Sequence, residues 1–197
     1  MSKKEEIILA TLDLASEYGL KSLSMSQIAE RVGIKKPSLY NHFESKEMLL
    51  KEMYEYIRNK SRKKIYNTMN SEYFADKSAY DILCESVVNY KNMVLSDEML
   101  NFYKVIYSER SISNEASQIL IEETDKMVNA TKFLFKMLNE TNKLFVDNID
   151  IASISFSMTI HSLIDYELDC IKTNNEYNKA IIKQYIKWFC DTYRKDE

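Results

Sequence analysis

The chain has 197 residues, of which only two are Gly and one is Pro. Average usage would give roughly fourteen Gly and ten Pro, so the many tight turns of an all-β fold are excluded. Hydrophobic residues make up 45% of the chain and can bury a sizeable core, while the net charge is −3. We therefore predict an all-α protein of about nine helices.

The charge is unevenly distributed along the chain. Residues 1–64 carry 13 Lys and Arg against 9 Asp and Glu, and residues 65–197 carry 14 against 21. The first segment thus has a balance of +4 and the second a balance of −7. This asymmetry favours an anionic partner for the N-terminal segment rather than for the whole chain.

Several kinds of site are not indicated by the sequence. Cys84, Cys170 and Cys190 lack metal-ligand spacing, and His161 with Asp165 makes a poor metal site. We find no Ser/His/Asp group, Gly-rich phosphate loop or paired-carboxylate motif. We therefore expect no enzyme activity and no cofactor. Because no signal peptide or membrane-spanning stretch is predicted, a cytoplasmic location is expected.

The first helices are predicted from apolar spacing and caps. An apolar face runs along residues 3–18, and Gly19 ends this helix. Ser24 or Ser26 can cap a second helix, and Gln27 stands at capping-box spacing from Ser24. Later helices are expected over these ranges, with polar joints at 68–78 and 139–148: 45–67, 78–95, 97–108, 114–139, 148–172 and 176–194.

A helix-turn-helix is predicted in SQIAERVGIKKPSLYNHF, residues 26–43. Gly33 permits the turn, Pro37 suits the first turn of the following helix, and Leu39 and Phe43 fill the wedge between the helices. The outer face is left with polar and charged side chains: Lys35, Lys36, Ser38, Tyr40, Asn41 and His42. Such groups contact phosphates and base edges, so this face is predicted to bind DNA.

A longer series of spaced positions covers residues 7–50. It comprises Ile8 through Gly19, S-x-x-x-IA-x-x-x-G-I at 24–34, LY-x-HF at 39–43 and SKEMLL at 45–50. In order and spacing these positions resemble the N-terminal DNA-binding domain of TetR-family transcriptional regulators. The resemblance covers about a quarter of the chain and implies an all-helical dimer with a variable C-terminal domain.

The resemblance also implies roles at matching positions. Residues 36–38 would open a recognition helix in the major groove, and Tyr40 and Lys46 would bind phosphate. Lys35 and Lys36 stand where many relatives have small or neutral residues, which means either further phosphate contacts or guanine reading by Lys36. The predicted DNA-binding residues are Ser24, Ser26, Lys35, Lys36, Pro37, Ser38, Tyr40, Asn41, His42 and Lys46.

The C-terminal segment is predicted to dimerise and to bind an effector. Apolar faces on its last two helices predict a two-fold four-helix bundle, with these interface residues: Ile151, Ile154, Met158, Ile181, Tyr185 and Phe189. Candidates for an effector site are apolar and aromatic groups with one polar anchor, each of which also fits plain core packing: Phe102, Tyr103, Tyr107, Met127, Phe133, Met137, Phe156 and His161. The Tyr and Met content favours a lipophilic or aromatic effector.

Together these observations predict a homodimeric repressor that binds a palindromic DNA operator and is released by a small molecule. Residues 1–48 would bind DNA, and residues 49–197 would sense the effector and dimerise. The alternative is a helical protein-interaction module with a vestigial helix-turn-helix.

Overall fold

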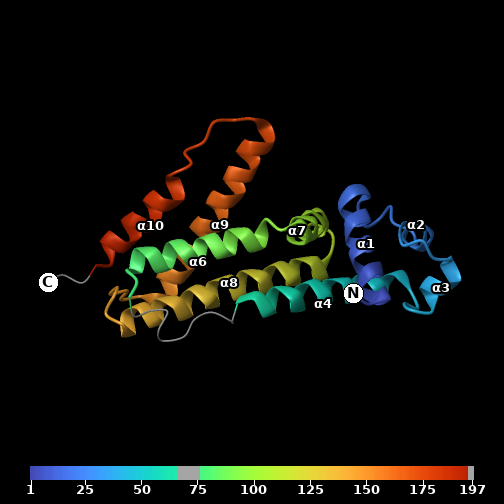
Figure 1. The fold of residues 1–197 in the computed structure, drawn as a ribbon, viewed down its shortest axis with the longest axis horizontal. Helices are drawn as coiled ribbons and strands as arrows, with labels where there is room; N and C mark the ends of the chain where they lie inside the picture. The colour runs from blue at the N-terminus through green and yellow to red at the C-terminus, as the bar shows by residue number, and fades with distance from the viewer. Residues whose placement is uncertain (66–75, 195–197) are drawn as a thin grey trace. The chain divides into compact units, whose positions relative to one another are not determined.

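The computed structural model describes residues 1–65 and 76–194 (Figure 1). Within these residues every regular element is an α-helix, and nine helices are present, which confirms the predicted all-α class. Their bounds are α1 Lys3–Tyr18, α2 Met25–Arg31, α3 Lys36–Tyr40, α4 Lys46–Ile65, α6 Ala79–Val94, α7 Asp97–Glu109, α8 Asn114–Glu140, α9 Ile149–Thr173 and α10 Ile181–Thr192.

The ends of the first helices follow local chemistry. Gly19 adopts φ 78° and ends α1, and Gly33 adopts φ 70° in the turn after α2. Both values lie in the left-handed region that Gly enters without a steric penalty. The predicted capping box of α2 is confirmed, because the Ser24 hydroxyl accepts from the backbone N–H of Gln27 while the Gln27 side chain accepts from the backbone N–H of Ser24.

The described chain divides into two compact units. The first holds α1–α4 together with the segment Met93–Leu120, which carries α7 and the start of α8. In it α1 packs most extensively on α7 and also contacts α2 and α4. One continuous apolar core joins these helices and includes the fully buried side chains of Ile28, Leu39 and Phe102.

The second unit holds most of α6 and α8 together with α9 and α10. Its core contains three mutually packed rings, Phe135 of α8, Phe156 of α9 and Phe189 of α10. Their centroids lie 5.4 Å (Phe135–Phe156), 5.0 Å (Phe135–Phe189) and 4.9 Å (Phe156–Phe189) apart, and each ring is at most 4% exposed. A single aromatic cluster therefore joins three helices.

One predicted boundary differs clearly from the structure. The last helix begins at Ile181 rather than near residue 176, since Tyr177 lies in the connection before it and its hydroxyl donates to Glu167 at 3.0 Å. The predicted joint at 68–78 lies mostly outside the described residues. Among the described helices, none combines the length and the apolar character that crossing a bilayer requires.

Candidate functional site

The predicted recognition helix, α3, is short and is held from one side. It has five residues, its cap residue Lys35 makes no side-chain capping bond, and Pro37 lies in its first turn. Leu39 and Phe43 are 0% and 1% exposed and anchor the helix in the core of the first unit. Because these apolar groups take up the inner face, the polar residues of the segment are directed to solvent.

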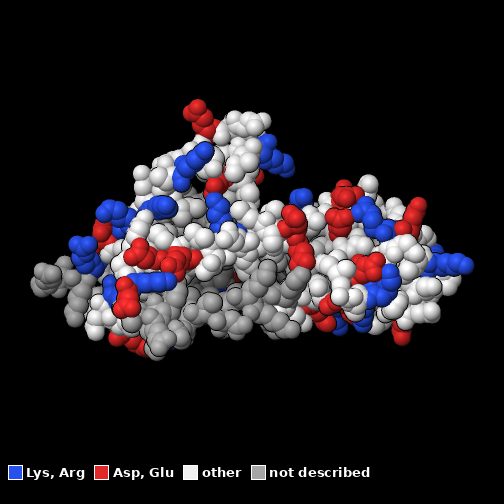
Figure 2. Space-filling view, in the orientation of Figure 1, with Lys and Arg blue, Asp and Glu red and all other residues white. Residues whose placement is uncertain are grey.

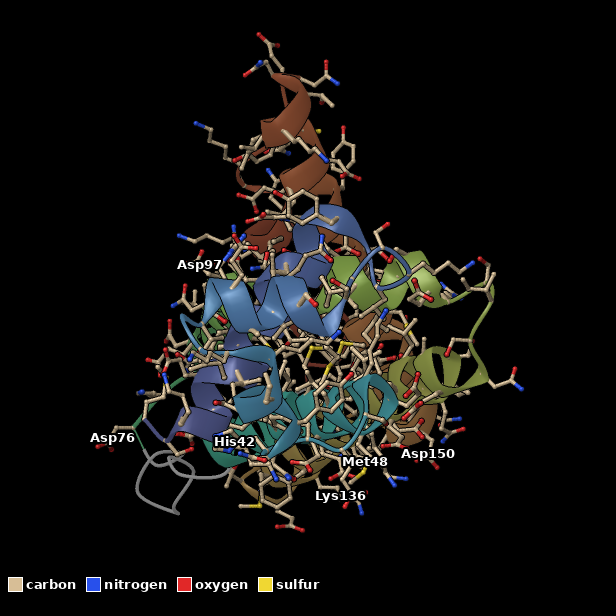
Figure 3. All side chains as sticks on the ribbon, turned by 90° about the vertical axis from the view of Figure 1, so that its right-hand side faces the viewer. His42, Met48, Asp76, Asp97, Lys136 and Asp150 are labelled. Carbon is tan, nitrogen blue, oxygen red and sulfur yellow. The ribbon has the colours of Figure 1, made fainter. Side chains whose placement is uncertain are left out.

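The predicted contact residues of this segment all lie on the surface of the unit. Lys35, Lys36, Pro37, Ser38, Tyr40, Asn41 and His42 are exposed. Tyr40 is 42% exposed, so its hydroxyl is available to a phosphate. Figure 3 views this unit from the side of α1–α3 and shows His42 at the surface. The fold thus gathers two cations, two hydroxyls, an amide and an imidazole on one exposed turn.

The two serines before and in α2 differ in their availability. The Ser24 hydroxyl is used within the chain, since it accepts from the N–H of Gln27 at 3.3 Å and donates to Gln27 Oε1 at 2.7 Å. Ser26 is exposed in the first turn of the helix. A phosphate contact by Ser24 therefore competes with a bond that caps α2, whereas Ser26 has no such role in the cap.

Lys46 is half-buried at the start of α4 and has a structural partner. Its ammonium donates a 2.7 Å hydrogen bond to the backbone carbonyl of Leu20, in the connection between α1 and α2. An ammonium carries three N–H donors, so this bond leaves capacity for a phosphate. The adjacent Glu47 carboxylate accepts from its own backbone N–H and from Ser45, which holds its pKa below the usual range.

A second lysine ties α1 to the recognition segment. Lys4 lies in the first turn of α1, with Nζ 2.5 Å from the carboxylate of Glu52 on α4 and 5.2 Å from the centroid of the Phe43 ring. These contacts join the N-terminus of α1 to α4 and to the residue Phe43 that follows α3. Figure 2 shows basic and acidic side chains interspersed over this part of the chain, so phosphate attraction depends on particular lysines rather than on a uniform positive field.

The candidate effector residues do not form one cluster within one unit. Phe102, Tyr103 and Tyr107 belong to α7 in the first unit, where Phe102 is fully buried and Tyr103 stacks on Tyr107 at 5.8 Å. The remaining five candidates lie in the second unit. Phe156 belongs to the aromatic cluster and Phe133 is exposed, whereas the other three are half-buried: Met127, Met137 and His161.

His161 has one partner, Tyr90, that the sequence did not reveal. Its Nδ1 shares a 2.8 Å hydrogen bond with the hydroxyl of Tyr90 on α6, and its Nε2 lies 3.6 Å from the carboxylate of Asp165. Burial raises the pKa of Asp165, and the charge of His161 partly offsets this. Nearby in sequence, Glu167 binds Lys91 of α6 and Tyr177. Tyr90 lies 71 residues before His161, and no spacing pattern links positions so distant.

The predicted dimer residues separate into an exposed and an inner group. Ile151, Ile154 and Met158 of α9 are 61%, 46% and 41% exposed and lie at helical spacing on one face. On α10, Ile181 and Tyr185 are half-buried, while Phe189 is 2% exposed in the aromatic cluster. Trp188, next to it, is 59% exposed and had no place in the prediction.

Comparison with known proteins identifies the N-terminal helices with a described family. Residues 7–53 match the family described as bacterial regulatory proteins, tetR family. A 44-residue segment is 46% identical to the class A tetracycline repressor protein from transposon 1721 of Escherichia coli, and covers 22% of this chain and 20% of that protein. The matched segments span about a fifth to a third of the curated relatives.

Solved structures extend the likeness in fold over nearly the whole chain. A TetR-family regulator from Mesorhizobium loti MAFF303099 superposes with a TM-score of 0.66 at 18% identity, over 98% of this chain and 97% of that one. The flavonoid-responsive regulator FrrA superposes with a TM-score of 0.68 at 17% identity, over 99% of this chain and 98% of that one. The predicted resemblance is confirmed over residues 7–53, which carry the signature of the tetR family. Beyond these residues the solved structures show a likeness in fold alone.

Proposed function

We propose that the chain is a DNA-binding transcriptional repressor that acts as a dimer on a palindromic operator. One observation carries the proposal: the family signature folds into a helix-turn-helix whose residues 35–38 and 40–42 are exposed while Leu39 and Phe43 are buried. The exposed groups have the chemistry that DNA recognition uses, cations for phosphate and side-chain donors for base edges.

The dimer is supported by the exposed apolar face on α9. Ile151, Ile154 and Met158 form a row that a monomer would leave in water, and the exposed Trp188 on α10 adds a large aromatic surface. Contiguous apolar patches of this kind mark interaction sites. A two-fold pairing buries the same face twice and presents two recognition helices, which read half-sites about 34–36 Å apart.

Side chains of the second unit and the names of the relatives both support binding of a small-molecule effector. The second unit contains the half-buried Met127 and Met137, which are adaptable apolar groups, and the Tyr90–His161 pair, which can serve as a polar anchor. The names tetracycline repressor and flavonoid-responsive regulator state a small-molecule response for those proteins. A lipophilic or aromatic effector that favours one dimer geometry would release the operator by its differential affinity for the two states.

Operator binding is tested on the DNA that flanks the chain's own gene. A fluorescent fragment that binds should be titrated from about 50 to 200 mM salt, over which log K should fall linearly with log salt by about 0.9 per neutralised phosphate. An affinity independent of salt contradicts phosphate contact. Failure to bind any flanking fragment, together with a co-purifying protein partner, favours the alternative of a protein-interaction module.

Lys36→Ala should relax sequence preference at one base pair of each half-site. Lys36 is the first residue of α3 and is exposed, and the N-terminal residues of a recognition helix contact base edges. We expect a loss of about 1–3 kcal/mol of discrimination at that position, measured by competition with single-base variants of the bound fragment. Lys35→Ala is the matched control and should weaken all sequences alike, because Lys35 precedes the helix.

Lys46→Met should lower both stability and operator affinity. The substitution keeps the length of the side chain but removes the donor to Leu20 and one cation near the DNA-facing segment. We expect a loss of about 1 kcal/mol in the free energy of unfolding. The slope of log K against log salt should become shallower by about 0.9, the contribution of one neutralised phosphate. Lys51→Met, at an exposed position of the same helix, serves as control. An unchanged slope would assign Lys46 a purely structural role.

A further inference from the structure

A buried hydroxyl on α6 is left without a partner. The side-chain oxygen of Ser86 is closed off from solvent, and no group within residues 1–65 and 76–194 forms a hydrogen bond with it. Other hydroxyls on helices of the second unit donate to the carbonyl four residues earlier, as three of them show: Thr131, Ser153 and Ser157. Ser86 also lies inside a helix, so its hydroxyl is turned away from the carbonyl that such groups ordinarily bind.

An unpaired hydroxyl in the interior is unfavourable, because in the unfolded chain water forms hydrogen bonds with it. Buried polar groups in native proteins nearly always have a partner, so an exception calls for a physical explanation. Against the described residues Ser86 uses neither its O–H donor nor its lone pairs. A molecule that binds beside Ser86 and offers a polar oxygen would recover the missing hydrogen bond.

Ser86 lies on the inner face of α6, one turn before Tyr90. Residues four apart share a helix face, and Ile82, one turn before Ser86, is 0% exposed. The Tyr90 hydroxyl shares a 2.8 Å hydrogen bond with Nδ1 of His161 on α9, and the centroids of the two rings lie 6.2 Å apart. The unpaired hydroxyl is therefore one helical turn from the polar contact that joins α6 to α9.

The neighbouring hydroxyls on α8 and α9 satisfy one another. Ser157, one turn before His161, is 2% exposed and shares a 2.9 Å hydrogen bond with the hydroxyl of Thr131 on α8. Met127 is half-buried one turn before Thr131, and a Met side chain adapts its shape to what packs on it. This part of the second unit thus combines paired hydroxyls, an adaptable apolar group and aromatic rings with the unpaired Ser86.

Two half-buried carboxylates of the second unit have cationic partners within the chain. Glu167 of α9 is 19% exposed, binds Lys91 of α6 and accepts from the hydroxyl of Tyr177 at 3.0 Å. Glu123 of α8 is 11% exposed and binds Lys126. A charged ligand would have to displace one member of such a pair, whereas the unpaired group is a neutral hydroxyl. The arrangement therefore favours a neutral ligand.

We propose that Ser86 is a specificity-determining residue of the effector site and selects a neutral aromatic molecule that carries a hydroxyl group. A ligand hydroxyl can both donate to Ser86 and accept from it, while the ring adds apolar contact with groups such as Met127. A site that pairs with a ligand hydroxyl discriminates against an analogue that lacks it, because a buried polar group is then left unpaired. The proposal rests on the small-molecule response proposed above and specifies its chemistry.

Matched pairs of probes test this selection in the full chain without DNA. Para-cresol is compared with para-xylene, and β-naphthol with β-methylnaphthalene, because the members of each pair differ only in a hydroxyl in place of a methyl group. In equilibrium dialysis at least one phenol should bind about five- to tenfold more tightly than its methyl partner. Ser86→Ala should bring this ratio close to one. Ser162→Ala, at an exposed position of α9, is the matched control and should preserve it.

A second measurement uses the chain without any probe. Ser86→Ala should leave the midpoint of urea unfolding unchanged or raise it, because the substitution removes a buried hydroxyl that has no partner among the described residues. Ser157→Ala is the comparison: it removes a hydroxyl that bonds both Thr131 and the carbonyl of Ser153, and it should lower the midpoint.

The possible outcomes separate this inference from the proposed function. Equal binding of both members of every pair, or binding of no probe, overturns the selection by Ser86. A midpoint for Ser86→Ala as low as that for Ser157→Ala also overturns it, because the hydroxyl would then be stabilised without a ligand. Neither result bears on operator binding, since DNA is absent. A hydroxyl preference that depends on Ser86, with no release of a bound operator fragment by the phenol, overturns the effector response instead.

Discussion

Ile154→Glu should convert the proposed dimer to a folded monomer. Ile154 is 46% exposed between Ile151 and Met158 on α9, so in the single chain the new carboxylate stays in water at little cost. In a two-fold dimer the face is buried against its copy, and symmetry places two carboxylates there. Removing them from water without partners costs several kcal/mol, enough to shift dissociation by orders of magnitude.

Sedimentation velocity at micromolar concentration measures this change, and circular dichroism checks that the helices remain. Val88→Glu is the matched control, since Val88 is an apolar residue of α6 that is 53% exposed. It should leave the dimer intact. A monomeric natural protein, or a dimer that survives Ile154→Glu, would show that α9 is not the interface.

The same variant should bind the operator poorly. A dimer engages the second half-site at a high effective concentration, which raises avidity by about 10²–10⁴ over a single contact. Ile154→Glu should lose most of this gain although every residue of the helix-turn-helix is retained. Titration of a full operator and of a half-site fragment separates the two effects, because the affinity for the half-site should be unchanged.

Phe189→Ala should be the most destabilising single substitution considered for the second unit. The ring is 2% exposed and packs on Phe135 at 5.0 Å and on Phe156 at 4.9 Å, so its removal leaves a cavity where three helices meet. Truncation of a buried Phe to Ala typically costs about 3–5 kcal/mol. We expect a loss of this size in urea unfolding at fixed protein concentration.

A neighbouring substitution on α10 provides the control. Lys187→Ala changes a side chain that is 72% exposed, two residues from Phe189 on the same helix. Its effect on the free energy of unfolding should stay within about 0.5 kcal/mol. If Phe189→Ala were equally mild, the aromatic cluster would not be the core that joins α8, α9 and α10.

The helix-turn-helix could be predicted because its determinants are local. The capping box of Ser24 and Gln27, the positive φ of Gly19 and Gly33 and the alternation of buried and exposed residues around Leu39 all depend on neighbours within a few positions. The family resemblance drew on these same spaced positions, and it was confirmed on residues 7–53.

The partners of individual side chains could not be predicted in this way. Lys46 lies at a position where the family resemblance implies phosphate binding, yet in the structure its ammonium donates a hydrogen bond to the carbonyl of Leu20, 26 residues away. Phe189 was assigned to a dimer interface from its periodicity, and it lies in the core of its own unit. Helical spacing shows which residues share a face, but an apolar face is the same whether it meets another helix of the chain or a second copy.

The amino-acid order was sufficient for the all-helical class, the capping box of α2 and the exposed turn from Lys35 to His42, since hydrogen bonds and apolar spacing over a few residues decide these features. Folding in three dimensions was needed to assign α7 to the unit of α1 and to bring Tyr90 to His161 and Asn101 to Asp13. These pairs are separated by 71 and 88 residues. Contacts at such separations depend on how complete helices pack, and no local pattern records that packing.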